Sequence, residues 1–207
     1  MSANIAQLLE AAARRWLDKT VLLQEGEGLD FKTLERRAGG FASMLAGRGI
    51  GRGDRIALQF HNRLSFVTAL WGGLKAGVAV APLNRRLLPA ELDKIIADLE
   101  PALVVKDLDP SEDDFQPVET DSSDPAIILY TSGSTGTAKG VLLSHGATDF
   151  ALESWKTPVM DLSTDDIVLS ALPLAHSLGI FGSVMAPLLA GACIVFLPRF
   201  TPEDAVE

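Results

Sequence analysis

Glycines, hydroxyl side chains and one lysine are concentrated between Leu129 and Val141, in the sequence LYTSGSTGTAKGV. The glycines are Gly133, Gly136 and Gly140, the hydroxyl residues are Thr131, Ser132, Ser134, Thr135 and Thr137, and the lysine is Lys139. Glycines let a backbone fold back so that several N–H groups converge on an anion. Hydroxyls add rotatable donors and Lys139 adds a positive charge. This combination favours a polyphosphate site over the alternative, a plain polar hairpin loop.

The flanking sequence decides which kind of phosphate loop this is. The apolar run AIILYTS (126–132) predicts a strand before the loop, and GVLLSH (140–145) predicts a second strand after it. The common nucleotide-triphosphatase loop ends in Lys followed by Ser or Thr and opens a helix, whereas Lys139 is followed by Gly140. No G-x-G-x-x-G pattern is present, so a dinucleotide fingerprint is excluded as well.

Two segments carry a resemblance to a known superfamily. YTSGSTGTAKG (130–140) is similar to the pattern Tyr-Thr-Ser-Gly-(Ser/Thr)-Thr-Gly-x-Pro-Lys-Gly of adenylate-forming enzymes, with Ala138 in place of the usual proline. LPLAHSLG resembles the next segment of the same enzymes, Pro-Leu-x-His-x-x-Gly, through Pro173, Leu174, His176 and Gly179. The stretch from residue 29 to 105 also looks like the N-terminal part of an acyl-CoA synthetase. The chain therefore resembles acyl-CoA synthetases most among the adenylate-forming (AMP-binding) enzymes.

The resemblance implies a reaction in two halves. A carboxylic acid attacks the α-phosphate of ATP, bound with Mg²⁺, to give an acyl-adenylate and pyrophosphate, and coenzyme A then displaces AMP. It implies catalytic roles for Lys139, which stabilises the leaving pyrophosphate, and for His176, beside the carboxylate. The ATP-binding residues that it implies are Thr131, Ser132, Gly133, Ser134, Thr135, Gly136 and Lys139. No metal-ligating residue is assigned.

Other readings remain open. An amino-acid-activating enzyme, or one that loads a carrier protein, shares these motifs. A non-catalytic fragment that pairs with itself as a homodimer is a further alternative, because an incomplete fold exposes apolar surface. The family's later adenine, ribose and magnesium motifs and its C-terminal lysine domain are not in the sequence. We therefore expect residues 1–207 to form a partial AMP-binding N-terminal domain that has no ligase activity by itself.

Alternating apolar strands and amphipathic helices predict the fold class. Helices are expected over 5–16, 29–50, 62–77, 88–100, 146–160 and 179–191, and strands over 20–24, 53–60, 78–83, 102–106, 126–132, 140–145, 166–174 and 192–198, with a turn over 26–28. Near-continuous apolar strands between helices favour an α/β fold of layered parallel or mixed sheets covered by helices. The sequence predicts the incomplete N-terminal domain of the adenylate-forming fold.

An acidic stretch interrupts this pattern between Asp107 and Asp124. It holds eight carboxylates and no Lys or Arg, and Pro110 and Pro117 fall within it. We expect a solvated surface connector. A metal site is the alternative, although the spacing matches no calcium loop.

Composition and charge set the remaining limits. The chain is 47% hydrophobic, enough for a sizeable core, and its net charge of −9 argues against nucleic acid as a partner. Neither a secretory signal nor an apolar run long enough to span a membrane is visible, so we expect a cytoplasmic protein. Cys193, the single cysteine, is expected to be a buried inert thiol. His145 is expected to be structural, and His61 a surface residue or a helix entry.

Overall fold

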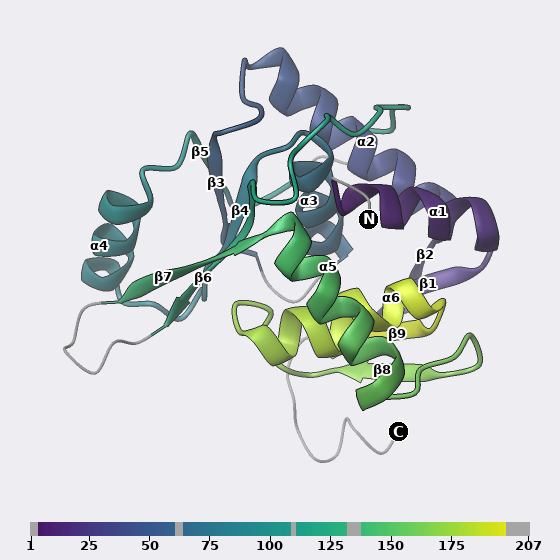
Figure 1. Ribbon diagram of the computed structural model, residues 1–207. Coiled ribbons are helices and arrows are strands. Elements are labelled where there is room, and N and C mark those ends of the chain that lie inside the picture. The colour runs from purple at the N-terminus through teal and green to yellow at the C-terminus, as the bar shows by residue number, and fades with distance from the viewer. Residues whose placement is uncertain (1–3, 61–63, 109–110, 132–137, 198–207) are drawn as a thin grey trace.

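Two β-sheets, each built mainly from parallel strands, organise the chain (Figure 1). The computed structural model describes residues 4–60, 64–108, 111–131 and 138–197. The five-stranded sheet has the order β5-β3-β4-β6-β7, and the four-stranded sheet has the order β2-β1-β9-β8. The strands are β1 (Thr20–Gln24), β2 (Glu27–Asp30), β3 (Arg55–Leu58), β4 (Ala79–Pro82), β5 (Leu103–Val105), β6 (Pro125–Thr131), β7 (Lys139–Ser144), β8 (Ile167–Ser170) and β9 (Cys193–Phe196).

Helices cover these sheets, so the predicted α/β fold is confirmed. The helices are α1 (Ala6–Trp16), α2 (Phe31–Gly47), α3 (Leu64–Lys75), α4 (Pro89–Leu99), α5 (His145–Ser154) and α6 (Ala186–Ala190). Two further segments, η1 (Trp155–Val159) and η2 (Leu178–Met185), are π-helical. They lie where ordinary α-helix was expected.

Side-chain alternation along the five-stranded sheet divides the core in two. Successive strand residues point to opposite faces. On β3, Ile56 and Leu58 belong to the large core, whereas Ala57 between them belongs to the smaller core beneath α4. Figure 1 shows the result, with α4 on one side of this sheet and α2 and α3 on the other.

Helix α3 lies in the middle of the large core. Its residues are buried on every side, which is the pattern of a helix enclosed by other elements rather than one on the surface. Lys75 at its end is also fully buried, and its ammonium group pairs with Glu35 and, at 3.5 Å, with Glu10. A buried charge needs such partners because its desolvation is costly. The three residues therefore join α1, α2 and α3 at one point.

The β1–β2 hairpin is a feature that the sequence pattern missed. Only a turn was expected over 26–28, but Glu27–Asp30 pairs with β1 in antiparallel register. Glu25 and Gly26 both have positive φ angles, +49° and +83°, as a tight two-residue hairpin turn requires. Asp30 ends β2 and also caps α2, since its side chain accepts a hydrogen bond of 2.7 Å from the Thr33 N–H.

Most of the described residues of the acidic connector are exposed, although Thr120 is buried, and the connector is attached to α2. Arg36 on α2 contacts Glu112 at 3.1 Å, and Ser43 donates a hydrogen bond to Asp113. Gly39 and Gly40 leave room for the connector backbone. A Cβ atom at these positions would lie 2.2 Å from the carbonyl oxygen of Asp113 and 2.1 Å from that of Ser111, respectively. Within the described residues no group of three or more His, Cys, Asp or Glu side chains is placed to hold a metal ion.

Candidate functional site

The glycine-rich loop leaves the five-stranded sheet through a neck of two paired strands. Strands β6 and β7 are antiparallel, and Thr131 faces Lys139 in the last pair of their register. Ser132, Gly133, Ser134, Thr135 and Gly136 lie outside the described residues. The two strands expected on either side of the glycine-rich segment are therefore present, and both Thr131 and Lys139 are exposed.

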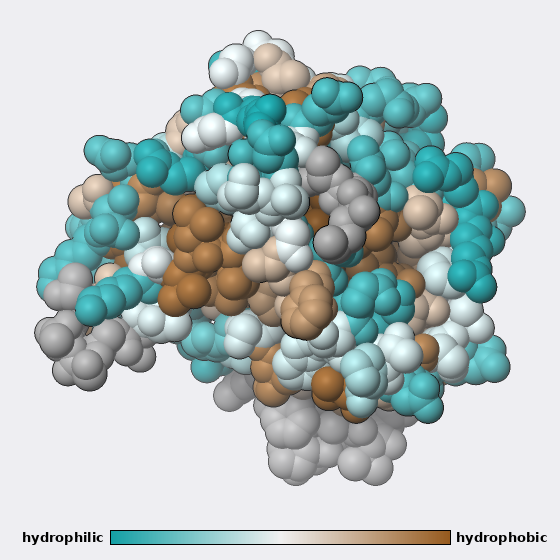
Figure 2. Space-filling model, in the orientation of Figure 1, coloured by the Kyte–Doolittle hydropathy of each residue, from teal (hydrophilic) through white to brown (hydrophobic). Residues whose placement is uncertain are grey.

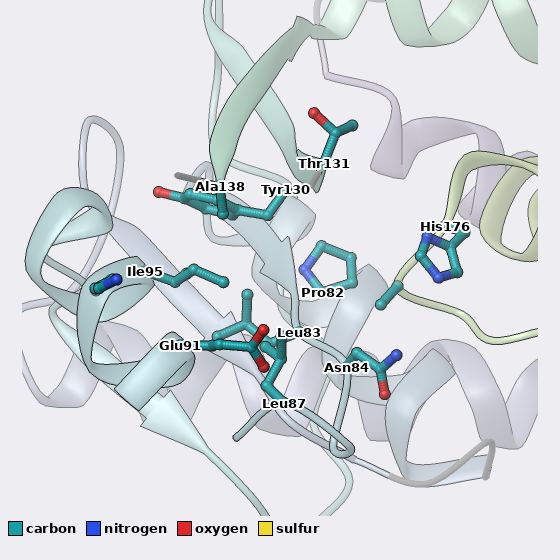
Figure 3. A pocket seen from close by; sticks show the side chains of 12 residues that line it. Pro82, Leu83, Asn84, Leu87, Glu91, Ile95, Tyr130, Thr131, Ala138 and His176 are labelled. Atoms are coloured by element: carbon teal, nitrogen blue, oxygen red, sulfur yellow. The ribbon is translucent and has the colours of Figure 1, made fainter. Parts of the chain in front are cut away.

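A cavity of about 340 Å³ opens beside this neck (Figure 3). Four parts of the chain line it: the end of β4 with the turn after it, helix α4, the neck, and the turn before η2. Its lining residues are Pro82, Leu83, Asn84, Leu87, Glu91, Lys94, Ile95, Tyr130, Thr131, Ala138, Ala175 and His176. The cavity thus lies at the carboxyl ends of parallel strands β4 and β6, where ligands bind in open α/β sheets.

The cavity brings together residues from both sequence motifs. Thr131 belongs to the glycine-rich segment and His176 to the PLAHSLG segment, and both line the same space. Figure 3 shows His176 and Thr131 on the same side of this space, across from Glu91 and Ile95 of α4. Lys139 is not among the lining residues; it stands opposite Thr131 at the neck.

A tight turn packed against η2 holds His176. The His176 N–H donates to the Pro173 carbonyl at 3.2 Å, and the His176 carbonyl accepts from the Ile180 N–H at 2.9 Å. Gly179 is the point of closest approach, because a Cβ atom there would lie 2.2 Å from the Pro173 carbonyl oxygen. The glycine of the second motif therefore allows η2 to contact the turn that presents the imidazole.

Two polar side chains that line the cavity accept hydrogen bonds from nearby backbone N–H groups. The Asn84 side chain accepts a hydrogen bond of 2.9 Å from the Arg86 N–H. Glu91 accepts one of 2.9 Å from the Leu88 N–H and so caps the start of α4. These bonds stiffen the turn between β4 and α4, so Asn84 and Glu91 shape the wall of the cavity.

Tyr130 is a site residue that was not singled out from the sequence. Its hydroxyl donates a hydrogen bond of 2.7 Å to Asp98 on α4. Burial, followed by the hydrogen bond and charge of Asp98, raises the pKa of Tyr130 far above its usual value. The phenol therefore remains a protonated donor. The helical spacing of Lys94 and Asp98 could have suggested that both lie on the same face of α4, but nothing local links Asp98 to Tyr130.

The other singled-out residues lie elsewhere. His145 is buried at the start of α5, where its Nδ1 accepts a hydrogen bond of 3.3 Å from the Ile5 N–H. Burial lowers the pKa of His145 to about 4, against a smaller opposing effect of Asp124. Cys193 on β9 is partly exposed rather than buried, because it lies on the less covered face of the four-stranded sheet. Burial still raises the pKa of its thiol, with Lys19 opposing. His61 falls outside the described residues.

The sequence model of the family described as AMP-binding enzyme matches residues 9–114 and 106–207. The chain belongs to this family. Among curated proteins it is 29% identical to sulfoacetate–CoA ligase of Cupriavidus necator, over 96% of this chain and 46% of that protein. It is 28% identical to L-proline–[L-prolyl-carrier protein] ligase of Pseudomonas fluorescens, over 91% and 44%. This AMP-binding chain thus spans less than half the length of either relative.

Solved structures of AMP-binding enzymes share its fold. ATP-bound MatB from Rhodopseudomonas palustris superposes with a TM-score of 0.87 at 28% identity, over all of this chain and 47% of that protein. The match agrees with the fold expected for the N-terminal part of an adenylate-forming enzyme. In the described part of this AMP-binding chain, no helix is long and apolar enough to cross a membrane.

Proposed function

We propose that this chain is the N-terminal part of an AMP-forming acid–thiol ligase, which activates a carboxylic acid as an acyl-adenylate and passes it to coenzyme A. The observation that carries the proposal is the shared cavity. It places His176 of one motif beside Thr131, the first residue of the phosphate-loop motif. Thr131 and His176 are 45 positions apart in the sequence, so their meeting at one cavity is hard to explain by two separate structural features.

The neck residues have a direct electrostatic role in this proposal. Thr131 and Lys139 face each other, so a phosphate chain held by the loop would lie between a hydroxyl donor and an ammonium group. Lys139 is exposed in the described structure, so its ammonium group is accessible to an anion from solvent. It would stabilise negative charge as it builds on the departing pyrophosphate. The loop would hold the nucleotide in the orientation for in-line attack.

ATP is the substrate that fits the donor groups at the neck, and magnesium would accompany it. In the part of the chain that the structure describes, no group of three or more His, Cys, Asp or Glu side chains is placed to hold a metal ion. Magnesium would supply charge neutralisation on the phosphates when it is bound with ATP. The proposed ATP-binding residues are Thr131, Ser132, Gly133, Ser134, Thr135, Gly136 and Lys139.

The acid would lie on the His176 side of the cavity. Pro82 and Ala175 give this region small apolar walls, and His176 provides an imidazole at the edge. An imidazole can donate a hydrogen bond to a carboxylate and keep it near the phosphate. We therefore propose His176 as the group that positions the carboxylate for attack.

The acyl acceptor in the second half-reaction is either coenzyme A or a carrier protein. One relative is named as a CoA ligase and another as a carrier-protein ligase. Coenzyme A is our first choice because the sequence resembles acyl-CoA synthetases most. Acyl transfer to coenzyme A, compared with transfer to a phosphopantetheinylated carrier protein, distinguishes the two acceptors.

A binding experiment on the 207-residue chain tests the proposal. We expect isothermal titration calorimetry to detect Mg-ATP and inorganic pyrophosphate, and the Lys139→Ala variant to bind both at least tenfold more weakly. Lys106→Ala is the matched control, since Lys106 is an exposed lysine that follows β5 and does not line the cavity. Wild-type protein that binds neither ligand, or equal losses in both variants, would contradict the proposal.

A second candidate is self-association, favoured by one surface feature. Val141 and Leu142 on β7 are 46% and 54% exposed, and Figure 2 shows an apolar area over this strand. Because β7 is the edge strand of its sheet, a second copy could cover it. Light scattering tests this. A dimer that the Leu142→Lys variant dissociates is the expected result, and a monomeric wild-type protein rejects the candidate.

A further inference from the structure

Tyr130 connects the neck of the loop to helix α4. It is the residue before Thr131 on β6, and its hydroxyl donates to the Asp98 carboxylate at 2.7 Å. The two residues are 32 positions apart in the sequence. Helix α4 forms its backbone hydrogen bonds within itself and not with the sheet. Side-chain contacts therefore set its distance from the neck.

The ring of Tyr130 also packs across the neck. Tyr130 faces Gly140 in the register of β6 and β7. A Cβ atom on Gly140 would lie 3.2 Å from the ring carbon Cζ and 3.4 Å from the hydroxyl oxygen. Glycine at this position therefore lets the ring lie against β7 while its hydroxyl reaches α4. One side chain contacts both strands of the neck and the helix.

Helix α4 and the neck form facing walls of the cavity. The helix contributes Glu91, Lys94 and Ile95, and the neck contributes Tyr130, Thr131 and Ala138. Asp98 lies one helical turn beyond Lys94, on the same face. A bond between Asp98 and Tyr130 thus fixes the spacing of the two walls at one end of the cavity.

We infer that the Tyr130–Asp98 hydrogen bond positions the neck of the phosphate loop against α4, and that Tyr130 is a positioning residue for nucleotide binding. The inference rests on the proposed function, because the neck matters only if the loop binds phosphate. The bond removes freedom of the neck before the ligand arrives. Its loss adds an ordering cost to binding, which lowers affinity without removing any group that contacts the ligand.

The electrostatic surroundings keep the bond intact near neutral pH. Burial of the ring, followed by the hydrogen bond and charge of Asp98, raises the pKa of Tyr130, and Arg55 opposes this. The guanidinium of Arg55 lies 3.7 Å from the Glu100 carboxylate, and this negative charge reduces the extent to which Arg55 lowers the pKa of Tyr130.

The chain provides a specific probe because Tyr130 is its only tyrosine. With tyrosine labelled by ¹³C at Cζ, NMR follows one resonance as the pH rises. In wild-type protein we expect no ionisation up to about pH 11, where an ordinary tyrosine is mostly ionised. In Asp98→Asn, which keeps the size but removes the charge, ionisation should begin at lower pH. Asp93→Asn is the control, an exposed carboxylate on the same helix that does not line the cavity.

Calorimetry with inorganic pyrophosphate then measures the positioning role. We expect Tyr130→Phe and Asp98→Ala each to weaken binding about three- to tenfold, which is within the range for the net contribution of one typical hydrogen bond. The double variant should be no weaker than either single one, since both remove the same bond. Asp93→Asn should bind like wild type.

Each outcome has a separate meaning. An unchanged tyrosine titration in Asp98→Asn overturns the bond itself. A shifted titration with wild-type pyrophosphate affinity in Tyr130→Phe and Asp98→Ala overturns the positioning role but leaves the proposed function standing. Additive losses in the double variant also overturn it. Wild-type protein that binds no pyrophosphate overturns the proposed function, and the positioning role with it.

Discussion

Replacing Gly179 with alanine tests how the second motif is built. The Gly179 Cβ position lies 2.2 Å from the carbonyl oxygen of Pro173 and 2.9 Å from its carbon. Ordinary contact begins at 3.4 Å, so the turn and η2 must separate by roughly 1 Å in a tightly packed region. The obstacle is backbone, which cannot rotate away as a side chain can.

We expect Gly179→Ala to lower the free energy of unfolding by about 1–3 kcal/mol, the usual cost of overpacking. Alanine's better helix propensity offsets at most about 1 kcal/mol of this. Gly182→Ala is the matched control on the same helix. Its Cβ would meet the side chains of Trp155 and Leu178 at 3.0 and 3.1 Å, and these can adjust. Its loss of stability should be smaller than that of Gly179→Ala, because side chains can move aside and the Pro173 backbone cannot.

Urea unfolding measures the stability of both variants, and imidazole NMR measures the site. The His176 resonance should move in Gly179→Ala and stay near its wild-type position in Gly182→Ala, because His176 sits on the turn that is pushed away. Equal stability of the two variants would refute the close contact. A destabilised Gly179→Ala with an unmoved His176 resonance would refute the idea that this glycine positions the imidazole.

Three further predictions concern other parts of the molecule. The pKa of His145 is lowered by burial to about 4, from about 6.5 in the unfolded chain. The unfolded state therefore binds a proton first as pH falls, and up to about 3 kcal/mol of stability should be lost between pH 6.5 and 4. Urea unfolding of the His145→Gln variant, measured across this pH range, should not show this loss of stability. Lys139→Ala should slow acyl-adenylate formation in the active ligase about 100-fold, while acyl transfer from preformed adenylate to the thiol slows less. Rapid-quench measurement of each half-reaction checks this, and equal losses of rate in the two half-reactions would contradict stabilisation of the leaving group. Gly40→Ala should lower the free energy of unfolding by about 1–3 kcal/mol because its Cβ would meet the connector backbone, whereas Gly47→Ala on the same helix, with nothing within 4 Å, should be neutral or slightly stabilising. Urea unfolding measures both variants, and similar stabilities would mean that the connector does not contact α2 at Gly40.

Most helices and strands could be predicted because their signals are local. Apolar residues at helical spacing indicated α1, and apolar runs of strand length indicated β4 and β6. Gly191, which ends α6 with a φ of +80°, occupies the left-handed conformation that favours glycine. The missed strand β2 has two exposed residues of four, so it carries little pattern of its own and forms only because β1 pairs with it.

The site divides in the same way. Thr131 and Lys139 were predicted from residue types and spacing, because the chemistry of phosphate binding restricts which side chains can serve, whereas His176 was predicted from the resemblance to adenylate-forming enzymes. Tyr130 and Asp98 were missed, since a single hydrogen bond between a strand and a distant helix leaves no periodic signal. The acidic connector was predicted to be a solvated surface segment, and its attachment at Gly39 and Gly40 could not be predicted, because it depends on two backbones that meet only in the folded chain.

The sequence by itself determined the α/β class, the strand–loop–strand motif and the family, because each depends on residues close together in the chain. Tertiary structure decided how the strands separate into two sheets, where β9 pairs with β1 although about 170 residues lie between them. It also decided that Thr131 and His176 share one cavity with α4 as the opposite wall. Such distances follow from the packing of buried side chains between layers, and that packing is a property of the whole core rather than of any segment.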